Sequence, residues 1–312
     1  MILQQPKTSD LDYYLKFLPE HISKAIAYTD DNIKKNLTEI RLRENAPLSL
    51  TVSKENLLID PRGRRTDMKS CLCVGRKELD SCVNNLCDGS YHTQINNIKN
   101  GFIITGAGYR IGVCGKIIYT DNSDLIIDEI TSVNMRVNRF ILFPDCPVLD
   151  IIKERGLTGI LIYSPPSEGK TTLLRFIAAA LSKGMYGLKK YRTALIDERR
   201  ELYIKDKMNG GLLDIFHGYK KSDGIDCATR TLNPDIIICD EIGALEDTRS
   251  ILSAQNSGVP LIATTHAGSF EQLKRKPNIN NLIENGVFEY FAGISLDNNN
   301  IIKYKIERLI FD

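Results

Sequence analysis

Residues 160–174 read ILIYSPPSEGKTTLL, and this stretch decides the fold. It opens with four apolar, β-prone residues, continues through a turn-forming loop, and enters an apolar, helix-prone run at Lys170. The order of strand, loop and helix is the context in which a phosphate-binding loop of the GxxxxGK[ST] type is meaningful. Backbone N–H groups at a helix N-terminus point at an anion, and the helix dipole favours negative charge there. The stretch therefore predicts a site for phosphate groups.

The residues of this loop suit the nucleotide ATP with Mg²⁺. Gly169 lets the backbone approach a phosphate closely, Lys170 brings a mobile positive charge to the β- and γ-phosphates, and the Thr171 hydroxyl can ligate Mg²⁺. We expect the nucleotide cradle to comprise Ser164, Ser167, Glu168, Gly169, Lys170, Thr171 and Thr172. Ser164 stands where the motif has its first glycine, and the two prolines after it have no N–H to offer. The alternative is a simple helix cap at Ser167 after a proline-rich turn.

Composition is that of an ordinary globular protein. The 312 residues are 42% hydrophobic and 26% charged, and the net charge of +2 argues neither for nor against a nucleic-acid partner. No apolar run approaches the roughly 20 residues that span a bilayer. The first residues, MILQQPKTSD, lack the regions of a signal peptide. We therefore expect a cytoplasmic protein without direct membrane insertion, which associates with a membrane through partners.

Four of the eight cysteines, Cys71, Cys73, Cys82 and Cys87, fall within one short segment. A zinc site is one interpretation, but the spacing is not that of a usual zinc knuckle. Cys82 and Cys87 lie in a helical pattern, LDSCVNNLC. We favour the interpretation that the four are small residues buried in a core.

The chain divides into two predicted domains. Residues 1–146 mix a helical start, a strand at Leu37–Arg43, two short strands, a helix over 76–87 and a glycine-punctuated β-ribbon, which is typical of a small α+β domain. The segment FPDCP, with two prolines, marks the boundary. Residues 147–312 form the second domain.

The second domain alternates strands and helices. We place its strands at 159–163, 193–197, 235–240 and 260–265, and a final strand pair near the end, in NNNIIKYKIERLIF. Buried strands at this spacing predict an α/β fold with a parallel-rich sheet, of the RecA-like P-loop ATPase type.

Two pairs of carboxylates follow strands of this sheet. Asp240 and Glu241 end the run IIICDE, at the edge where ligands bind in open α/β sheets. Asp240 can hold Mg²⁺ and Glu241 can polarise the attacking water. In LIDERRE, Glu198 is a second candidate for water activation, although a surface ion-pair cluster is the alternative.

His266 and three arginines complete the candidate residues. His266 follows an apolar strand in IATTHAGS, where it has either a structural role or one in sensing phosphate. Arg110, Arg136 and Arg230 are candidates for the arginine that stabilises charge during phosphoryl transfer, although each has a structural ion pair as its alternative.

Seven segments in one order resemble the stage III sporulation protein AA family of endospore-forming bacteria. They are LTEIRLR with Pro47, GYRIGVCGK, NMRV, SPPSEGKTTLLR, LIDERRE, RTLNPDIIICDEIG and TTHAGS, from about residue 35 to the end. That family is similar to the hexameric ATPases of type II and type IV secretion, with LIDERRE at their acidic box and TTHAGS at their His box. The resemblance implies an ATPase that serves a channel complex at the mother cell–forespore membrane, with membrane-protein partners encoded beside it.

The leading hypothesis is thus a ring-forming Mg-ATP hydrolase that acts as a motor. One rival is a nucleotide-gated scaffold with negligible turnover. A second rival is a nucleic-acid-dependent ATPase, but the basic clusters PRGRR and KKYR scarcely interleave with aromatic residues, so we expect no nucleic-acid partner.

Overall fold

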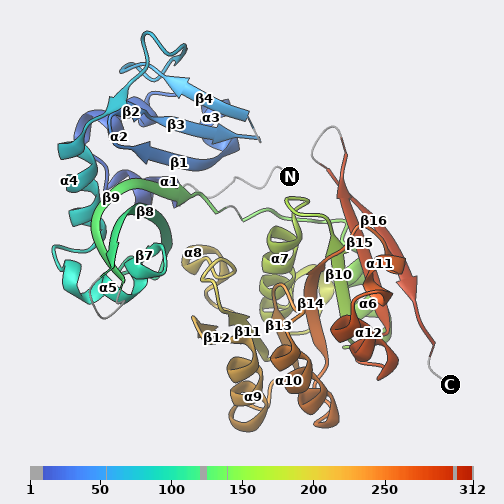
Figure 1. The fold of residues 1–312 in the computed structure, drawn as a ribbon. Helices are drawn as coiled ribbons and strands as arrows, with labels where there is room; N and C mark the ends of the chain where they lie inside the picture. Colours follow the sequence, from blue (N-terminus) through green and yellow to red (C-terminus); the bar gives the residue numbers. More distant parts are fainter. Residues whose placement is uncertain (1–9, 54, 120–124, 139, 298–300, 311–312) are drawn as a thin grey trace. The chain divides into compact units, whose positions relative to one another are not determined.

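A computed structural model describes residues 10–53, 55–119, 125–138, 140–297 and 301–310. The chain forms two compact units, residues 1–139 and 140–312 (Figure 1). The sequence places the boundary after residue 146, in the proline-containing segment. The division falls earlier because Phe140 and Phe143 pack against the core of the second unit, where the Phe143 ring centroid lies 5.4 Å from that of Phe176.

The first unit contains an antiparallel sheet. Within the described residues its strand order is β5-β4-β3-β1-β9-β8-β7. The strands are β1 (Leu37–Arg43), β3 (Ser49–Val52), β4 (Glu55–Ile59), β5 (Arg65–Thr66), β7 (Phe102–Ile104), β8 (Arg110–Tyr119) and β9 (Leu125–Arg136), with a separate pair of β2 (Ala46–Pro47) and β6 (Cys73–Val74). The helices are α1 (Asp10–Leu15), α2 (Glu20–Ala27), α3 (Asp31–Asn36), α4 (Arg76–Leu86) and α5 (Tyr91–Lys99).

Alternation along the strands sets which face of this sheet is buried. In β1, Ile40 and Leu42 are fully buried, while Arg41 between them is partly exposed, as expected for a strand with one face on the core. Tyr14 of α1 and Leu79 of α4 are buried in the same apolar cluster. Helices therefore complete the core on one side of the sheet, and the predicted α+β domain is confirmed.

The second unit contains a mostly parallel sheet. Its strands are β10 (Ile160–Ser164), β11 (Thr193–Asp197), β12 (Leu213–His217), β13 (Ile236–Cys239), β14 (Leu261–His266), β15 (Tyr290–Leu296) and β16 (Ile302–Arg308). Their order is β12-β11-β13-β14-β10-β15-β16, and β16 is antiparallel to β15 whereas the other neighbours are parallel. β10, which opens the predicted phosphate loop, therefore lies inside the sheet.

Both faces of this sheet are covered. The helices are α6 (Pro147–Arg155), α7 (Lys170–Lys183), α8 (Lys205–Met208), α9 (Lys221–Thr231), α10 (Leu245–Asn256), α11 (Phe270–Lys274) and α12 (Pro277–Glu284), with a 3₁₀ turn at Met185–Gly187. Ile160 and Ile162 of β10 join an apolar cluster with α6 and α7, whereas Leu161 and Tyr163 face the cluster that contains α9, α10 and α12. This two-sided burial explains the uninterrupted apolar run of β10. No helix in the described ranges is both long and apolar enough to cross a membrane.

The four predicted strands of this sheet are present as β10, β11, β13 and β14, within a residue or two of their predicted ends. Two expectations need correction. β12 was not predicted from the sequence, because it is an edge strand whose half-exposed residues give a weak apolar signal. The predicted pair near the C-terminus is a single strand, β16, whose partner β15 lies earlier in the chain and includes the small residues Ala292 and Gly293. Residues 298–300 lie outside the described part.

The cysteines of the first unit differ in burial. Cys82 and Cys87 are buried in its core, as predicted. The same prediction is wrong for Cys73, which is exposed, and for Cys71, which is partly exposed, because Cys73 takes the outward position in β6 beside the buried Val74. Among the described residues, no group of three or more His, Cys, Asp or Glu side chains could hold a metal ion.

This difference predicts the rate at which each thiol reacts. Exposed Cys73 and Cys114 should react quickly with a thiol reagent in the native protein. Cys82 should react slowly, because burial raises the pKa of its thiol to about 12 and the thiolate is the reactive form. Titration should reach eight thiols after unfolding, and metal analysis should find no stoichiometric zinc. One tightly held zinc ion per chain would contradict this prediction.

Candidate functional site

The loop between β10 and α7 has the backbone of a phosphate cradle. Ser167 and Gly169 have φ angles of 64° and 91°. The second is easy for glycine, whereas the first is uncommon for a serine and has to be held by the surroundings. Glu168 provides part of that support, because its Oε2 accepts a hydrogen bond from the backbone N–H of Leu296 at 2.7 Å. The Glu168 side chain thus fastens the loop, while α7 begins directly after Gly169.

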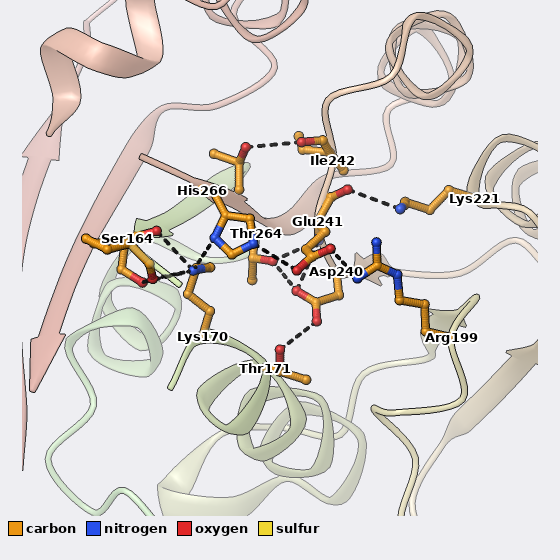
Figure 2. A network of polar contacts seen from close by, with 12 residues as sticks. Ser164, Lys170, Thr171, Arg199, Lys221, Asp240, Glu241, Ile242, Thr264 and His266 are labelled. Atoms are coloured by element: carbon orange, nitrogen blue, oxygen red, sulfur yellow. Dashed lines mark hydrogen bonds and ion pairs between the residues drawn. The ribbon is translucent and has the colours of Figure 1, made fainter. Parts of the chain in front are cut away.

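Lys170 is buried at the start of α7. Its Nζ donates to the backbone oxygen of Ser164 at 3.0 Å, to the Ser164 Oγ at 3.0 Å and to the backbone oxygen of Pro165 at 2.9 Å (Figure 2). Burial lowers the pKa of the Lys170 amine, and the carboxylates of Asp240 and Glu241 act in the opposite direction. The serine at the first position of the motif therefore contributes two oxygens to the lysine.

Thr171 and Asp240 meet at the carboxyl edge of the sheet. Thr171 Oγ1 donates to Asp240 Oδ2 at 2.7 Å, although the two residues lie 69 positions apart. The other Asp240 oxygen accepts from the hydroxyl of Thr264 and, at 3.0 Å, from the backbone N–H of Glu241. A hydroxyl and a carboxylate side by side are the hard oxygen donors that Mg²⁺ prefers. These residues therefore fit the predicted metal ligands.

His266 connects the phosphate loop to the carboxylates. It ends β14, next to Ser164 on β10 in the sheet. Its Nδ1 lies 3.0 Å from Lys170 Nζ, and its Nε2 lies 2.9 Å from Glu241 Oε1. An ammonium group only donates, so we assign Nδ1 as the acceptor and Nε2–H as the donor to Glu241. With this assignment the ring contacts both neighbours, and Nδ1 shares the three N–H bonds of Lys170 with the three loop oxygens.

Glu241 has its second partner in the acidic stretch. Arg199 Nη1 lies 2.6 Å from Glu241 Oε2. The main chain of Glu241 is also held, because its N–H donates to Thr264 Oγ1 at 2.9 Å and its oxygen accepts from Lys221 Nζ at 3.1 Å. Its φ of 49° is in the left-handed region. Neither Arg199 nor Lys221 was predicted from the sequence as a site residue. The charged stretch LIDERRE could have pointed to Arg199, whereas no comparable motif contains Lys221.

The carboxylates of LIDERRE have separate roles. Glu198 pairs with Lys221 at 3.0 Å, and the same Lys221 amine donates to the backbone oxygen of Glu241. Lys221 therefore bridges the two glutamates. A cavity of ≈20 Å³ lies beside Glu198, Lys221, Asp240 and Glu241, enough for about one water molecule. Glu198 thus remains a candidate for water activation.

Asp197 is structural. This buried side chain accepts hydrogen bonds from the backbone N–H groups of Glu201 at 2.8 Å and of Leu202 and Tyr203 at 3.0 Å. Arg175, buried in α7, donates from Nε to the oxygen of Leu202 at 3.0 Å. These bonds fix the turn that carries Arg199.

The remaining candidate residues belong to other elements of the chain. Arg230 lies on α9 with its side chain 78% exposed and 4.0 Å from Asp226. Arg110 and Arg136 belong to the first unit, where the Arg110 guanidinium stacks over Phe102 at 4.0 Å. Thr172 lies on α7, partly buried.

The sequence of this chain matches that of a known family. The model of the family "Sporulation stage III, protein AA" matches residues 11–301. The chain belongs to this family. It is 28% identical over 283 residues to the stage III sporulation protein AA of Bacillus subtilis (strain 168), with 89% of each protein covered.

Two solved structures share the fold. The ATPase DotB of Legionella pneumophila superposes with a TM-score of 0.63 at 17% identity, over all of this chain and 84% of DotB. The pilus retraction motor PilT, solved with bound ADP, gives 0.60 at 16% identity, over 90% of this chain and 82% of PilT. At these identities the likeness shows the fold alone, and the predicted α/β, RecA-like fold of the second unit is confirmed.

Proposed function

We propose that this member of the sporulation family is an Mg-ATP hydrolase of the secretion-ATPase type. The observation that carries the proposal is the contact of Thr171 with Asp240 at 2.7 Å, directly beside Lys170, His266 and Glu241. A nucleotide phosphate chain at the start of α7 would meet the helix N-terminus and an ammonium group. A carboxylate able to orient water would lie next to it.

Each residue of the site would have a separate role in phosphoryl transfer. Amides of residues 167–172 and Lys170 would bind the phosphates, and Thr171 with Asp240 would hold Mg²⁺, which supplies positive charge against the phosphate oxygens. Glu241, oriented by His266, would accept hydrogen bonds from the attacking water. Most of the rate enhancement in such sites comes from positioning and electrostatic stabilisation.

Phosphate release by the purified chain tests this proposal. We expect steady release from ATP that stops when EDTA removes Mg²⁺. Tight ATP binding with negligible release would instead favour the nucleotide-gated scaffold. Stimulation by DNA or RNA that falls steeply with salt would favour the nucleic-acid-dependent alternative.

We further infer that the chain acts as a homo-oligomeric ring, expected to be hexameric, on membrane-protein partners encoded beside it in a sporulation channel complex. The family membership and the fold shared with DotB and PilT support this inference. Light scattering with and without ATP measures the oligomeric state, and a chain that stays monomeric under both conditions would contradict the ring.

The candidate arginines give a prediction for the assembled state. Lysine at Arg110, Arg136 or Arg230 keeps the charge but loses the planar, bidentate guanidinium. If one of them stabilises the reacting phosphate, its lysine variant should lose turnover by a factor of about 10³ or more while it still binds ATP. Single-turnover hydrolysis and ATP affinity measured side by side separate the two effects. Normal turnover in all three variants would exclude these positions.

A further inference from the structure

Both carboxylate oxygens of Glu241 are already engaged, by partners from different elements. Oε1 faces His266 Nε2 at 2.9 Å, and Oε2 faces Arg199 Nη1 at 2.6 Å (Figure 2). The main chain of Glu241 is fixed on both sides by Thr264 and Lys221. Because the backbone is held, the direction of the carboxylate depends on these two side-chain partners.

Arg199 is more exposed than the other charged side chains and the histidine that contact Glu241. The turn that carries it is fastened by the bonds of Asp197 and Arg175 to the backbone of residues 201–203. The Arg199 side chain itself is 57% exposed, whereas that of Glu241 is 27% exposed. The arginine can therefore leave Glu241 by rotation of its own side chain, without a rearrangement of the turn.

A continuous chain of polar contacts connects this ion pair to the phosphate loop. It runs from Lys170 to His266, from His266 to Glu241, and from Glu241 to Arg199. Phosphates bound at the loop would attract the Lys170 ammonium, which now donates to His266 Nδ1. Occupancy of the loop would thereby change the contacts of the histidine that orients Glu241.

We propose that Arg199 is a positioning residue that holds Glu241 in a resting orientation, and that its departure from Glu241 is a step before hydrolysis. This inference rests on the proposed ATP hydrolysis. An oxygen that accepts a charge-assisted hydrogen bond is less available to a water molecule, because such bonds are stronger than neutral ones. An ion pair this exposed is also weak enough to exchange with solvent and ligand.

Turnover of an Arg199→Gln variant tests the proposal in the full chain. We expect kcat to rise roughly two- to fivefold, the factor that loss of an exposed ion pair supplies, while the Kd for ATP stays unchanged. Arg199→Lys keeps the charge and should show a smaller rise in kcat than Arg199→Gln. The double variant Arg199→Gln/Glu241→Gln should show no gain over Glu241→Gln, because the gain requires the carboxylate.

Arg200→Gln is the matched control. Arg200 is the next residue, but its guanidinium lies against Gly218 instead of Glu241, so its variant should keep the wild-type kcat. Thermal melting of each variant checks folding. An unchanged kcat in Arg199→Gln would overturn the proposal, and so would a fall, which would mean that Arg199 stabilises the reacting phosphate directly. A wild-type chain that binds but does not hydrolyse ATP would refute the proposed function itself and this inference with it.

Discussion

Replacing Lys170 with alanine should weaken ATP binding by at least about 100-fold, because two charge-assisted hydrogen bonds of ~1.5 kcal/mol each to the phosphates are lost. Lys170 Nζ lies within 3.0 Å of the loop oxygens and of His266 Nδ1, where an incoming phosphate chain would compete for it. Alanine removes the positive charge from the one end of α7 at which the helix N-terminus also favours an anion. Isothermal titration with Mg-ATP measures the loss directly.

The same substitution also removes the donor for the oxygens of Ser164 and Pro165, so part of any effect could arise from a weakened loop. Lys170→Gln retains a donor without the charge and should bind ATP almost as poorly as alanine. Lys183→Ala, at the opposite end of α7 where Nζ donates to the oxygen of Lys207 at 2.6 Å, is the matched control and should keep the wild-type Kd. If Lys170→Ala bound ATP with the wild-type affinity, the phosphates would have to lie elsewhere.

Much of the fold could be predicted because the burial pattern of several strands is visible in their sequence. The run Ile160–Ser164 is buried at all five positions, and the alternation in Leu37–Arg43 matches one buried face. The sequence signal was weak where burial was partial or side chains were small. Edge strand β12 is half exposed, and β15 contains Ala292 and Gly293, so neither carries a strong β pattern.

The residues that bind phosphate and Mg²⁺ could be proposed from the sequence, but the side-chain contacts among the site residues could not. The sequence identified Lys170, Thr171 and Asp240 from their spacing and from the strand ends that carry them. The neighbours of Glu241 depend on strand order, which brings β11 beside β13 and so places Arg199 next to the carboxylate. The order of the strands in a sheet cannot be read directly from the sequence. For the same reason Lys221, whose amine joins Glu198 to the backbone of Glu241, had no recognisable signal.

Replacing Glu241 with glutamine should leave ATP binding near the wild-type level and lower kcat by about 10²-fold or more, the usual contribution of a positioned acid–base group. An amide oxygen is a far weaker base than a carboxylate and cannot take up a proton from water. The amide also fits its neighbours poorly. His266 Nε2–H and Arg199 both donate to Glu241, so one of them would face the NH₂ group of glutamine in either orientation.

Glu198→Gln is the matched control, since Glu198 lies on the same edge and pairs with Lys221 at 3.0 Å. We expect its kcat to fall less than that of Glu241→Gln, because Glu198 lacks a contact with the His266 that reaches the phosphate loop. ATP affinity by titration and phosphate release in single turnovers should be measured on both variants. If Glu241→Gln hydrolysed ATP at the wild-type rate while Glu198→Gln did not, water activation would belong to Glu198, and the contacts among Lys170, His266 and Glu241 would be structural.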